Sequence, residues 1–217
     1  MKKIAVVLSG CGALDGSEIH ESVLTLLAID KAGAAYECFA PDMMQHRVMN
    51  FVTGQEIPEK RNVLLEAARI ARGKIRDIRE ANANDFDAVI FPGGFGAALN
   101  LCDFGIKGAD AKIRDDVKTF AKKFIEQKKP LGFICIAPGM IPLICGKGVT
   151  CTIGTDPQTA KTLETMGAIH EPCDVRHAVV DRDHKVVTTP AYMLGKSIGE
   201  VADGIEKLVH HVLEMTK

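Results

Sequence analysis

The residue best suited to chemistry is Cys135, which directly follows the apolar stretch Leu131 to Ile134. That stretch is typical of a short buried strand, and Ala137-Pro138-Gly139 is typical of a turn that opens a helix. A cysteine on such a corner is either a small apolar filler or a presented nucleophile. A helix N-terminus favours the thiolate, because its dipole and free amides stabilise negative charge. We therefore expect a nucleophile with a lowered pKa.

Carboxyl groups at the start of the predicted helix Ser17–Ala32 are candidate partners for the thiol. Asp15 and Glu18 have the spacing of a capping box, with Asp at the N-cap and Glu at N3, which is a structural reason for Glu18. Glu21 has no such reason, and a carboxyl group one turn into the helix could reach across to a thiol. The alternative is that Glu21 is solvated and favoured by the positive end of the helix dipole. Glu21 is the predicted partner, and Glu18 remains the other choice.

The loop Pro92-Gly93-Gly94-Phe95-Gly96 directly follows the predicted buried strand Asp87–Phe91. Two adjacent glycines allow backbone N–H groups to point into a crevice and hold an oxyanion. The alternative is a plain turn. Beside Cys135, the functional interpretation is favoured.

A second glycine loop, Gly10-Cys11-Gly12 followed by Gly16, is similar to a dinucleotide-binding motif. Its spacing is one residue too long, and the expected acidic residue about 20 positions further on is missing. A nicotinamide or flavin cofactor is therefore disfavoured, and a strand-to-helix turn that needs glycine is the simpler interpretation. We expect Cys11 to line the crevice.

Short apolar runs alternate with longer helical patterns, which predicts an α/β fold of the doubly wound type, with a mostly parallel sheet and helices on both faces. In such folds ligands bind beyond the carboxyl ends of the strands, so the three loops should line one crevice. In the first helix we expect a buried face with Ile19, Val23, Leu26 and Leu27, edged by Asp30. The other predicted elements are strands Ile4–Leu8, Ala35–Ala40 and Leu131–Cys135, helices Val63–Arg72, Asp115–Lys128, Thr159–Met166 and Lys196–Glu214, and a hairpin over 178–188.

Composition limits the classes of function. The 217 residues carry a net charge of −1, which argues against a nucleic-acid groove or a membrane-binding basic patch. We expect one domain over 1–217, with a small insertion at about 43–60. Seven cysteines without a Cys-x-x-Cys pair fit reduced thiols in the cytoplasm, and the histidines lack zinc-site spacing, so no metal is expected.

Taken together, the segments "LSGCGALDGSEIHE", "PGGFGAA", "LGFICIAP" and "VVTTPAYML" resemble the ElbB family, named for enhancing lycopene biosynthesis. This family lies in the PfpI-like branch of the class I glutamine amidotransferase-like superfamily. The resemblance implies a flavodoxin-like fold with Cys135 on a strained nucleophile elbow. It also implies a glyoxalase that converts glyoxal to glycolate without glutathione, metal or cofactor, a related protein-deglycase role, and a homodimer.

The resemblance also implies the roles of individual residues. Cys135 would be the nucleophile and Glu21 its acid/base partner. Because a charged Glu21 would oppose the effect of the helix dipole on the thiol pKa, we expect Glu21 to be protonated in the crevice and to donate a hydrogen bond to the sulfur. The N–H groups of Gly94 and Ile136 would form the oxyanion hole. The predicted substrate-binding residues are Gly93, Gly12 and Cys11, and the expected substrate is a small reactive aldehyde.

Two departures from the superfamily pattern exclude other activities. Many relatives carry a histidine directly after the nucleophile, where this chain has Ile136, and another in a later loop, where it has Thr152 and Ile153. Protease chemistry through a Cys-His pair is therefore not expected. Ammonia release from glutamine is not expected either, because the histidine-glutamate pair of glutamine amidotransferases is missing. The remaining alternatives are a redox sensor, in which an exposed, low-pKa Cys135 is oxidised, and an inert core cysteine.

Overall fold

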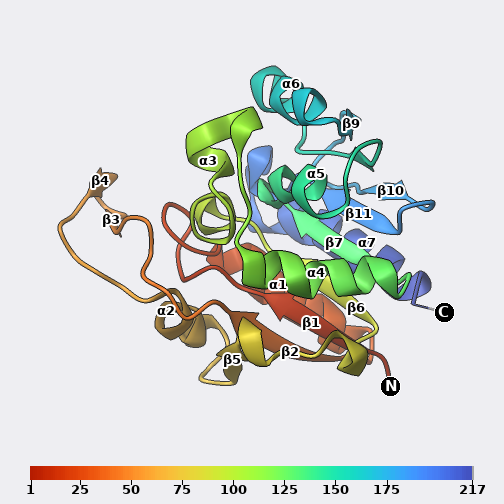
Figure 1. Cartoon of the computed structure of the whole chain (residues 1–217), viewed down its shortest axis with the longest axis horizontal. Coiled ribbons are helices and arrows are strands. Elements are labelled where there is room, and N and C mark those ends of the chain that lie inside the picture. Colours follow the sequence, from red (N-terminus) through yellow and green to blue (C-terminus); the bar gives the residue numbers. More distant parts are fainter. Residues whose placement is uncertain (217) are drawn as a thin grey trace.

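The computed structural model describes residues 1–216, and seven strands form its central sheet. They are β1 (Lys3–Val7), β2 (Ala35–Ala40), β5 (Ile75–Asp77), β6 (Ala88–Phe91), β7 (Leu131–Ile134), β10 (Val179–Asp181) and β11 (Val186–Thr189). Their order across the sheet is β10-β11-β7-β6-β1-β2-β5 (Figure 1). All neighbouring pairs are parallel except β10 and β11, which form the predicted hairpin.

Helices cover both faces of this sheet (Figure 1). The helices are α1 (Ile19–Lys31), α2 (Val63–Ile70), α3 (Phe104–Lys107), α4 (Asp115–Glu126), α5 (Ile141–Ile144), α6 (Pro157–Met166) and α7 (Ile198–Glu214). Side chains of α1, α2 and α7 belong to the core on one face, whereas those of α4 and α5 belong to the core on the other. The predicted doubly wound α/β fold is therefore confirmed. In the described residues, no helix is long and apolar enough to span a membrane.

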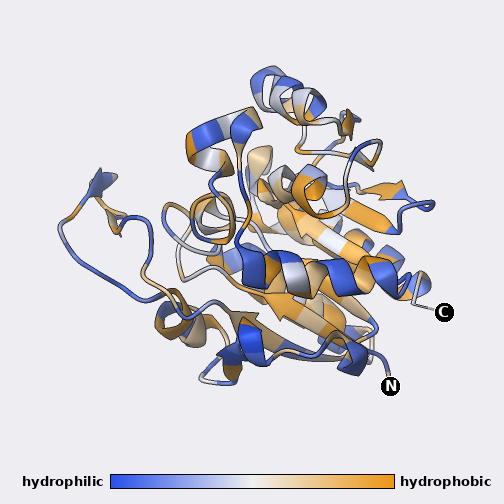
Figure 2. Cartoon of the chain, in the orientation of Figure 1, coloured by the Kyte–Doolittle hydropathy of each residue, from blue (hydrophilic) through white to orange (hydrophobic). Residues whose placement is uncertain are grey.

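Strand β1 shows why the strands are apolar along their whole length. Ile4 and Val6 pack under α1 and α7, whereas Ala5 and Val7 pack on the opposite side with the α4 residues. All four are 0% exposed, because successive side chains of a strand point to opposite faces and both faces are covered. Figure 2 shows the result as an apolar sheet behind helices with polar outer surfaces.

The predicted buried face of the first helix is largely wrong. Ile19, Val23 and Leu27 are 43%, 48% and 43% exposed. The buried face instead carries Ser22 and Thr25, whose hydroxyls donate to the carbonyls of Glu18 and Glu21 one turn earlier, together with Leu26, Ala28 and Ile29. Hydroxyl groups satisfied within the helix can be buried at little cost, so apolar spacing alone did not identify this face.

The predicted capping box is also wrong. Helix α1 begins at Ile19, and its N-cap is Glu18, whose Oε2 accepts a hydrogen bond from the N–H of Glu21 at 2.6 Å. Asp15 lies outside the helix, where its Oδ2 accepts a hydrogen bond from the N–H of Met49. The cap therefore moves three residues along the chain, which places Glu21 at the third helical position.

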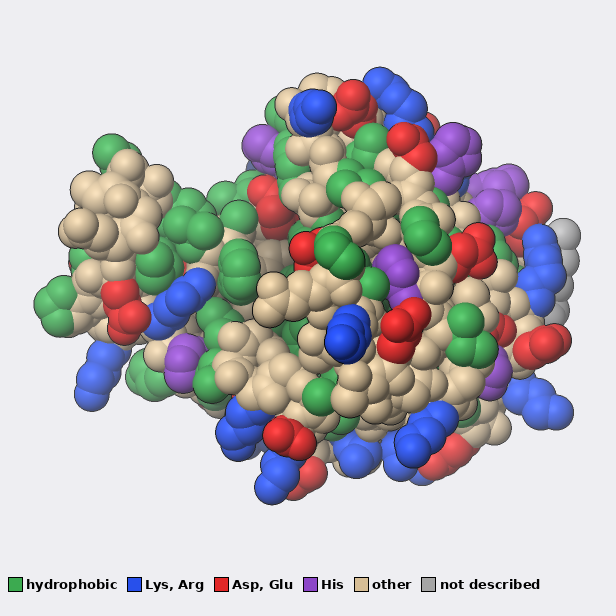
Figure 3. Space-filling view, turned by 90° about the horizontal axis from the view of Figure 1, so that it is seen from above, with side chains coloured by type: hydrophobic (Ala, Val, Ile, Leu, Met, Phe, Trp, Pro, Cys, Tyr) green, Lys and Arg blue, Asp and Glu red, His purple; other side chains and the backbone are tan. Residues whose placement is uncertain are grey.

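The segment 43–60, expected as an insertion, contains the antiparallel pair β3 (Met49–Asn50) and β4 (Gln55–Glu56). This hairpin stands away from the rest of the molecule (Figure 1). Seen from above, hydrophobic side chains gather where it meets the body (Figure 3). A further small pair that the sequence did not indicate, β8 (Thr150–Cys151) and β9 (Ile169–His170), is parallel.

Candidate active site

The site lies where neighbouring parallel strands end. Because β1, β6 and β7 are adjacent and parallel, the loops that follow them emerge at the same edge of the sheet. Cys135 comes directly after β7, and its N–H donates to the carbonyl of Thr189 at the end of β11, at 2.9 Å. Its φ of +62° is in the left-handed region, where a residue with a side chain is strained. This is the strained corner that the sequence resemblance implied.

Glu21 lies next to this corner and is completely buried, with 0% exposure. Its Oε2 accepts a hydrogen bond from the N–H of Gly93 at 2.9 Å, and its Oε1 accepts one from the N–H of Tyr192 at 3.1 Å. The carboxyl group lies close enough to Cys135 for its charge to raise the pKa of the thiol. The alternative of a solvated Glu21 is therefore wrong. Glu18, the other candidate, caps the helix instead.

Only glycine fits between the thiol and the carboxyl group. A Cβ atom on Gly93 would lie 2.4 Å from both the Cys135 Cβ and the Glu21 Oε2. Gly94 has a φ of +91°, and a Cβ there would lie 2.3 Å from the Glu18 nitrogen. These glycines thus bring the loop against both reactive side chains, because they lack the atoms that would separate them.

Burial controls protonation at this site. It raises the pKa of Glu21 to about 8, an effect that the nearby Glu18 reinforces and that the neighbouring Cys135 and the hydrogen bonds from the N–H groups of Tyr192 and Gly93 oppose. At neutral pH the Glu21 side chain is therefore mostly protonated, as the sequence analysis expected.

The expected lowering of the Cys135 pKa is wrong. Burial, and then the Glu21 charge, raise the pKa of the thiol well above its usual value, although the N–H groups of Gly94 and Ile136 oppose this rise. The structure following Cys135 is a single 3₁₀ turn, Ala137–Met140, and then the four-residue helix α5. So short a helix supplies little dipole to offset desolvation.

The other predicted substrate-binding residues, Cys11 and Gly12, have different surroundings. A Cβ on Gly12 would collide with the ring of Phe51 in the β3–β4 hairpin. Burial raises the pKa of Cys11, and the charged groups that act on it are Glu66, Arg69 and Asp15 rather than Glu21. This loop therefore faces the hairpin, and its contact with a substrate stays a prediction.

Tyr192 is the residue of this site that the sequence analysis did not single out. Besides its N–H bond to Glu21, its hydroxyl lies 2.8 Å from Nδ1 of His20. Tyr192 follows β11, whose carboxyl end is beside that of β7. Its position just after a predicted strand was the available signal.

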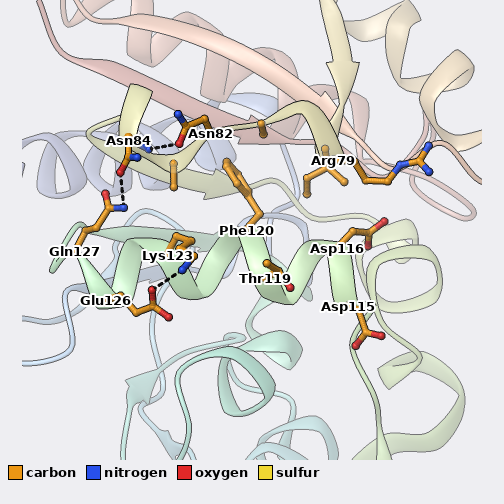
Figure 4. A pocket seen from close by; sticks show the side chains of 13 residues that line it. Arg79, Asn82, Asn84, Asp115, Asp116, Thr119, Phe120, Lys123, Glu126 and Gln127 are labelled. Atoms are coloured by element: carbon orange, nitrogen blue, oxygen red, sulfur yellow. Dashed lines mark hydrogen bonds and ion pairs between the residues drawn. The ribbon is translucent and has the colours of Figure 1, made fainter.

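The hollow that Figure 4 shows lies away from Cys135. A groove of about 750 Å³ runs between α4 and the segment 78–84, and Lys123, Glu126 and Gln127 are among the residues that line it. Cys135 does not line this groove. No group of three or more potential metal-ligating side chains occurs in residues 1–216.

Comparisons with known proteins agree with this fold. No protein-family model matches the chain. The chain is 43% identical over 224 residues to human glutamine amidotransferase-like class 1 domain-containing protein 3, mitochondrial, with 99% of this chain and 83% of that protein covered.

Solved structures are similar over the whole chain. An isoprenoid biosynthesis protein with amidotransferase-like domain from Ehrlichia chaffeensis is 33% identical, with a TM-score of 0.91 and 98% of this chain and 99% of that chain covered. Drosophila melanogaster DJ-1beta shares the fold at 17% identity and a TM-score of 0.56, over 99% of this chain and 95% of that chain.

Proposed function

The chain belongs to the glutamine amidotransferase-like class 1 domain proteins, and we propose that it is a cysteine-dependent glyoxalase of the ElbB group, converting glyoxal to glycolate without glutathione. The observation that carries this proposal is the wholly buried Glu21 carboxyl group, which lies beside Cys135 with only the backbone of Gly93 against both. A buried acid with a pKa of about 8 can both donate and accept a proton near neutral pH. Burying a carboxyl group is costly, and the two backbone hydrogen bonds that Glu21 accepts offset only part of that cost.

The first half of the mechanism makes a hemithioacetal. The ionised fraction of Glu21 accepts the thiol proton while the Cys135 sulfur attacks one aldehyde carbon of glyoxal. A carbon–sulfur bond forms, and the carbonyl π electrons move onto oxygen. The N–H groups of Gly94 and Ile136, which already act on the sulfur, would hold this oxyanion. Glu21 then returns its proton to the oxygen.

The second half moves hydrogen between the two carbons. Glu21 takes the proton from the carbon bonded to sulfur, which gives an enediol, and a proton is then delivered to the neighbouring carbon. The first carbon is oxidised to a thioester while the second is reduced to a hydroxymethyl group, so no external oxidant is needed. Water hydrolyses the thioester, releasing glycolate and the thiol. Release of an amine from a glycated protein would use the same residues.

Two further features of the chain support a reducing compartment and a homodimer for this activity. All seven cysteines are free, which suits a reducing compartment such as the cytoplasm. The exposed stripe Ile19, Val23 and Leu27 on α1 supports the expected homodimer. Sedimentation of the full chain at the monomer mass over a wide concentration range would count against that assembly.

The test is glyoxal turnover, measured as glycolate formed by the wild type and two variants. Cys135→Ser should lower kcat/KM by about 10³-fold or more, because the nucleophile is lost. Glu21→Gln should lower it by about 10²-fold or more, because the amide cannot transfer the proton. Full activity in Cys135→Ser would overturn the proposal. Rapid peroxide oxidation of Cys135 with no turnover in the wild type would favour the redox-sensing alternative.

A further inference from the structure

We infer that Glu18 is a specificity-determining residue: its carboxylate makes the surroundings of Cys135 negative, so that uncharged and cationic electrophiles reach the sulfur in preference to anionic ones. This inference rests on the proposed role of Cys135 as the nucleophile. It narrows the substrate class to uncharged or cationic carbonyl compounds and excludes aldehydes that carry a carboxylate or a phosphate.

Contacts on three sides fix Glu18 against the site. Its N–H donates to the carbonyl of Gly93 at 2.9 Å, and its Oε2 accepts from the N–H of Glu21 at 2.6 Å. Its nitrogen lies so close to Gly94 that a Cβ there would be 2.3 Å away. Gly93 in turn touches Cys135 and Glu21. Glu18 is therefore one residue removed from the sulfur.

The surrounding charges have a single sign. Glu18 raises the pKa of both Glu21 and Tyr192, and Glu21 raises the pKa of Tyr192 and Cys135. The charged groups that shift the pKa values of these three side chains most are Glu18 and Glu21 themselves. Because Glu21 is mostly protonated at neutral pH, Glu18 supplies the negative charge there. An anionic substrate would meet the repulsion of this carboxylate.

One neighbouring side chain needs its own control. His20 is on the same turn of α1 as Glu18, and its Nδ1 is 2.8 Å from the Tyr192 hydroxyl. A protonated imidazole would attract the anions that Glu18 repels. A His20→Gln variant therefore separates the contribution of this ring from that of the carboxylate.

The experiment compares two thiol reagents of similar size, the neutral iodoacetamide and the anionic iodoacetate. The full-length protein is alkylated at pH 7, and modification of Cys135 is quantified by peptide mass spectrometry, because the chain has seven cysteines. The ratio of the two rates is divided by the same ratio for N-acetylcysteine. This corrected ratio should exceed one in the wild type.

Replacing Glu18 with glutamine removes the charge but keeps an oxygen that can cap α1. Glu18→Gln should lower the corrected ratio about three- to tenfold, the effect expected of one unit charge close to the sulfur in a partly hydrated site. Glu126→Gln is the matched control, since Glu126 ends α4 shortly before β7 begins, at the opposite edge of the sheet from Cys135. It should leave the ratio unchanged.

Ionic strength provides a measurement without mutation. Raising salt from about 0.05 to about 0.5 M should lower the wild-type ratio towards one, because salt screens exposed charges. An unchanged ratio in Glu18→Gln, or an equal change in His20→Gln, would overturn the inference. Failure of the proposed function would give a different result from failure of this inference. Glyoxal turnover would then be absent, while the corrected alkylation ratio would still exceed one in the wild type and fall in Glu18→Gln.

Discussion

The groove beside α4 and the corner at Cys135 differ in two respects, the size of the hollow and the state of the polar side chains in it. The groove has a volume of about 750 Å³, yet its polar side chains pair with one another, as Lys123 does with Glu126 and Asn84 with Gln127 (Figure 4). At the corner the cysteine is only 8% exposed, yet a thiol and a carboxyl group have been moved away from their ordinary pKa values. In this molecule, the shifted pKa values follow the burial of titratable groups and not the size of a hollow.

The largest expected effect is a pH dependence of the free energy of unfolding, which should come from the corner and not from the groove. The buried Glu21 binds a proton in the native state up to its pKa of about 8, whereas the unfolded chain releases that proton near 4.5. Its contribution to stability is therefore fully present below pH 4.5 and is lost as pH rises towards 8, by up to about 1.4 kcal/mol for each pH unit. Glu21→Gln should remove this slope from urea unfolding measured between pH 5.5 and 8.5.

The matched control for this slope is Glu126→Gln in the groove, where the carboxylate is exposed and should leave the slope as in the wild type. Below about pH 5, Glu21→Gln should be the less stable protein by about 1 kcal/mol, because the amide nitrogen cannot accept one of the two backbone hydrogen bonds. A wild-type slope retained in Glu21→Gln would show that burial of this carboxyl group is not its source.

A smaller effect tests the close packing of the corner. Gly93→Ala places a methyl group 2.4 Å from both Cys135 and Glu21, so the loop must move. We expect a loss of about 1–3 kcal/mol in the free energy of unfolding, together with slower alkylation or turnover at Cys135. Gly199→Ala is the control, because its Cβ meets nothing within 4 Å and alanine favours the helix α7. Equal stability of the two variants would contradict the tight contact.

The smallest effect is expected in the groove itself. Lys123→Ala removes an exposed ion pair with Glu126, which contributes little in water. The free energy of unfolding should change by less than about 0.5 kcal/mol, and glyoxal turnover should not change. A loss of turnover comparable with that of Glu21→Gln would mean that the groove, and not the corner, holds the chemistry.

Much of this site could be predicted because it depends on the order of strands and loops. Cys135 and the Pro92–Gly96 loop each follow a buried apolar strand, and parallel strands bring such loops to one edge. The capping residue of α1 could not be found in this way, since Asp15 and Glu18 both have suitable side chains. The neighbouring loops decide between them, through the bond from Met49 to Asp15 and the bond from Glu18 to Gly93.

The sequence by itself determined the α/β class, the parallel sheet and the position of a cysteine on a corner, because these follow from periodicity and from residue types at strand ends. Only the tertiary structure decided the direction in which the thiol pKa moves. The direction of the Cys135 pKa depends on desolvation by groups distant in the chain, and the Glu21 carboxyl group gains its bond from Tyr192 across 171 positions. Desolvation depends on the whole surrounding volume, which no local pattern records.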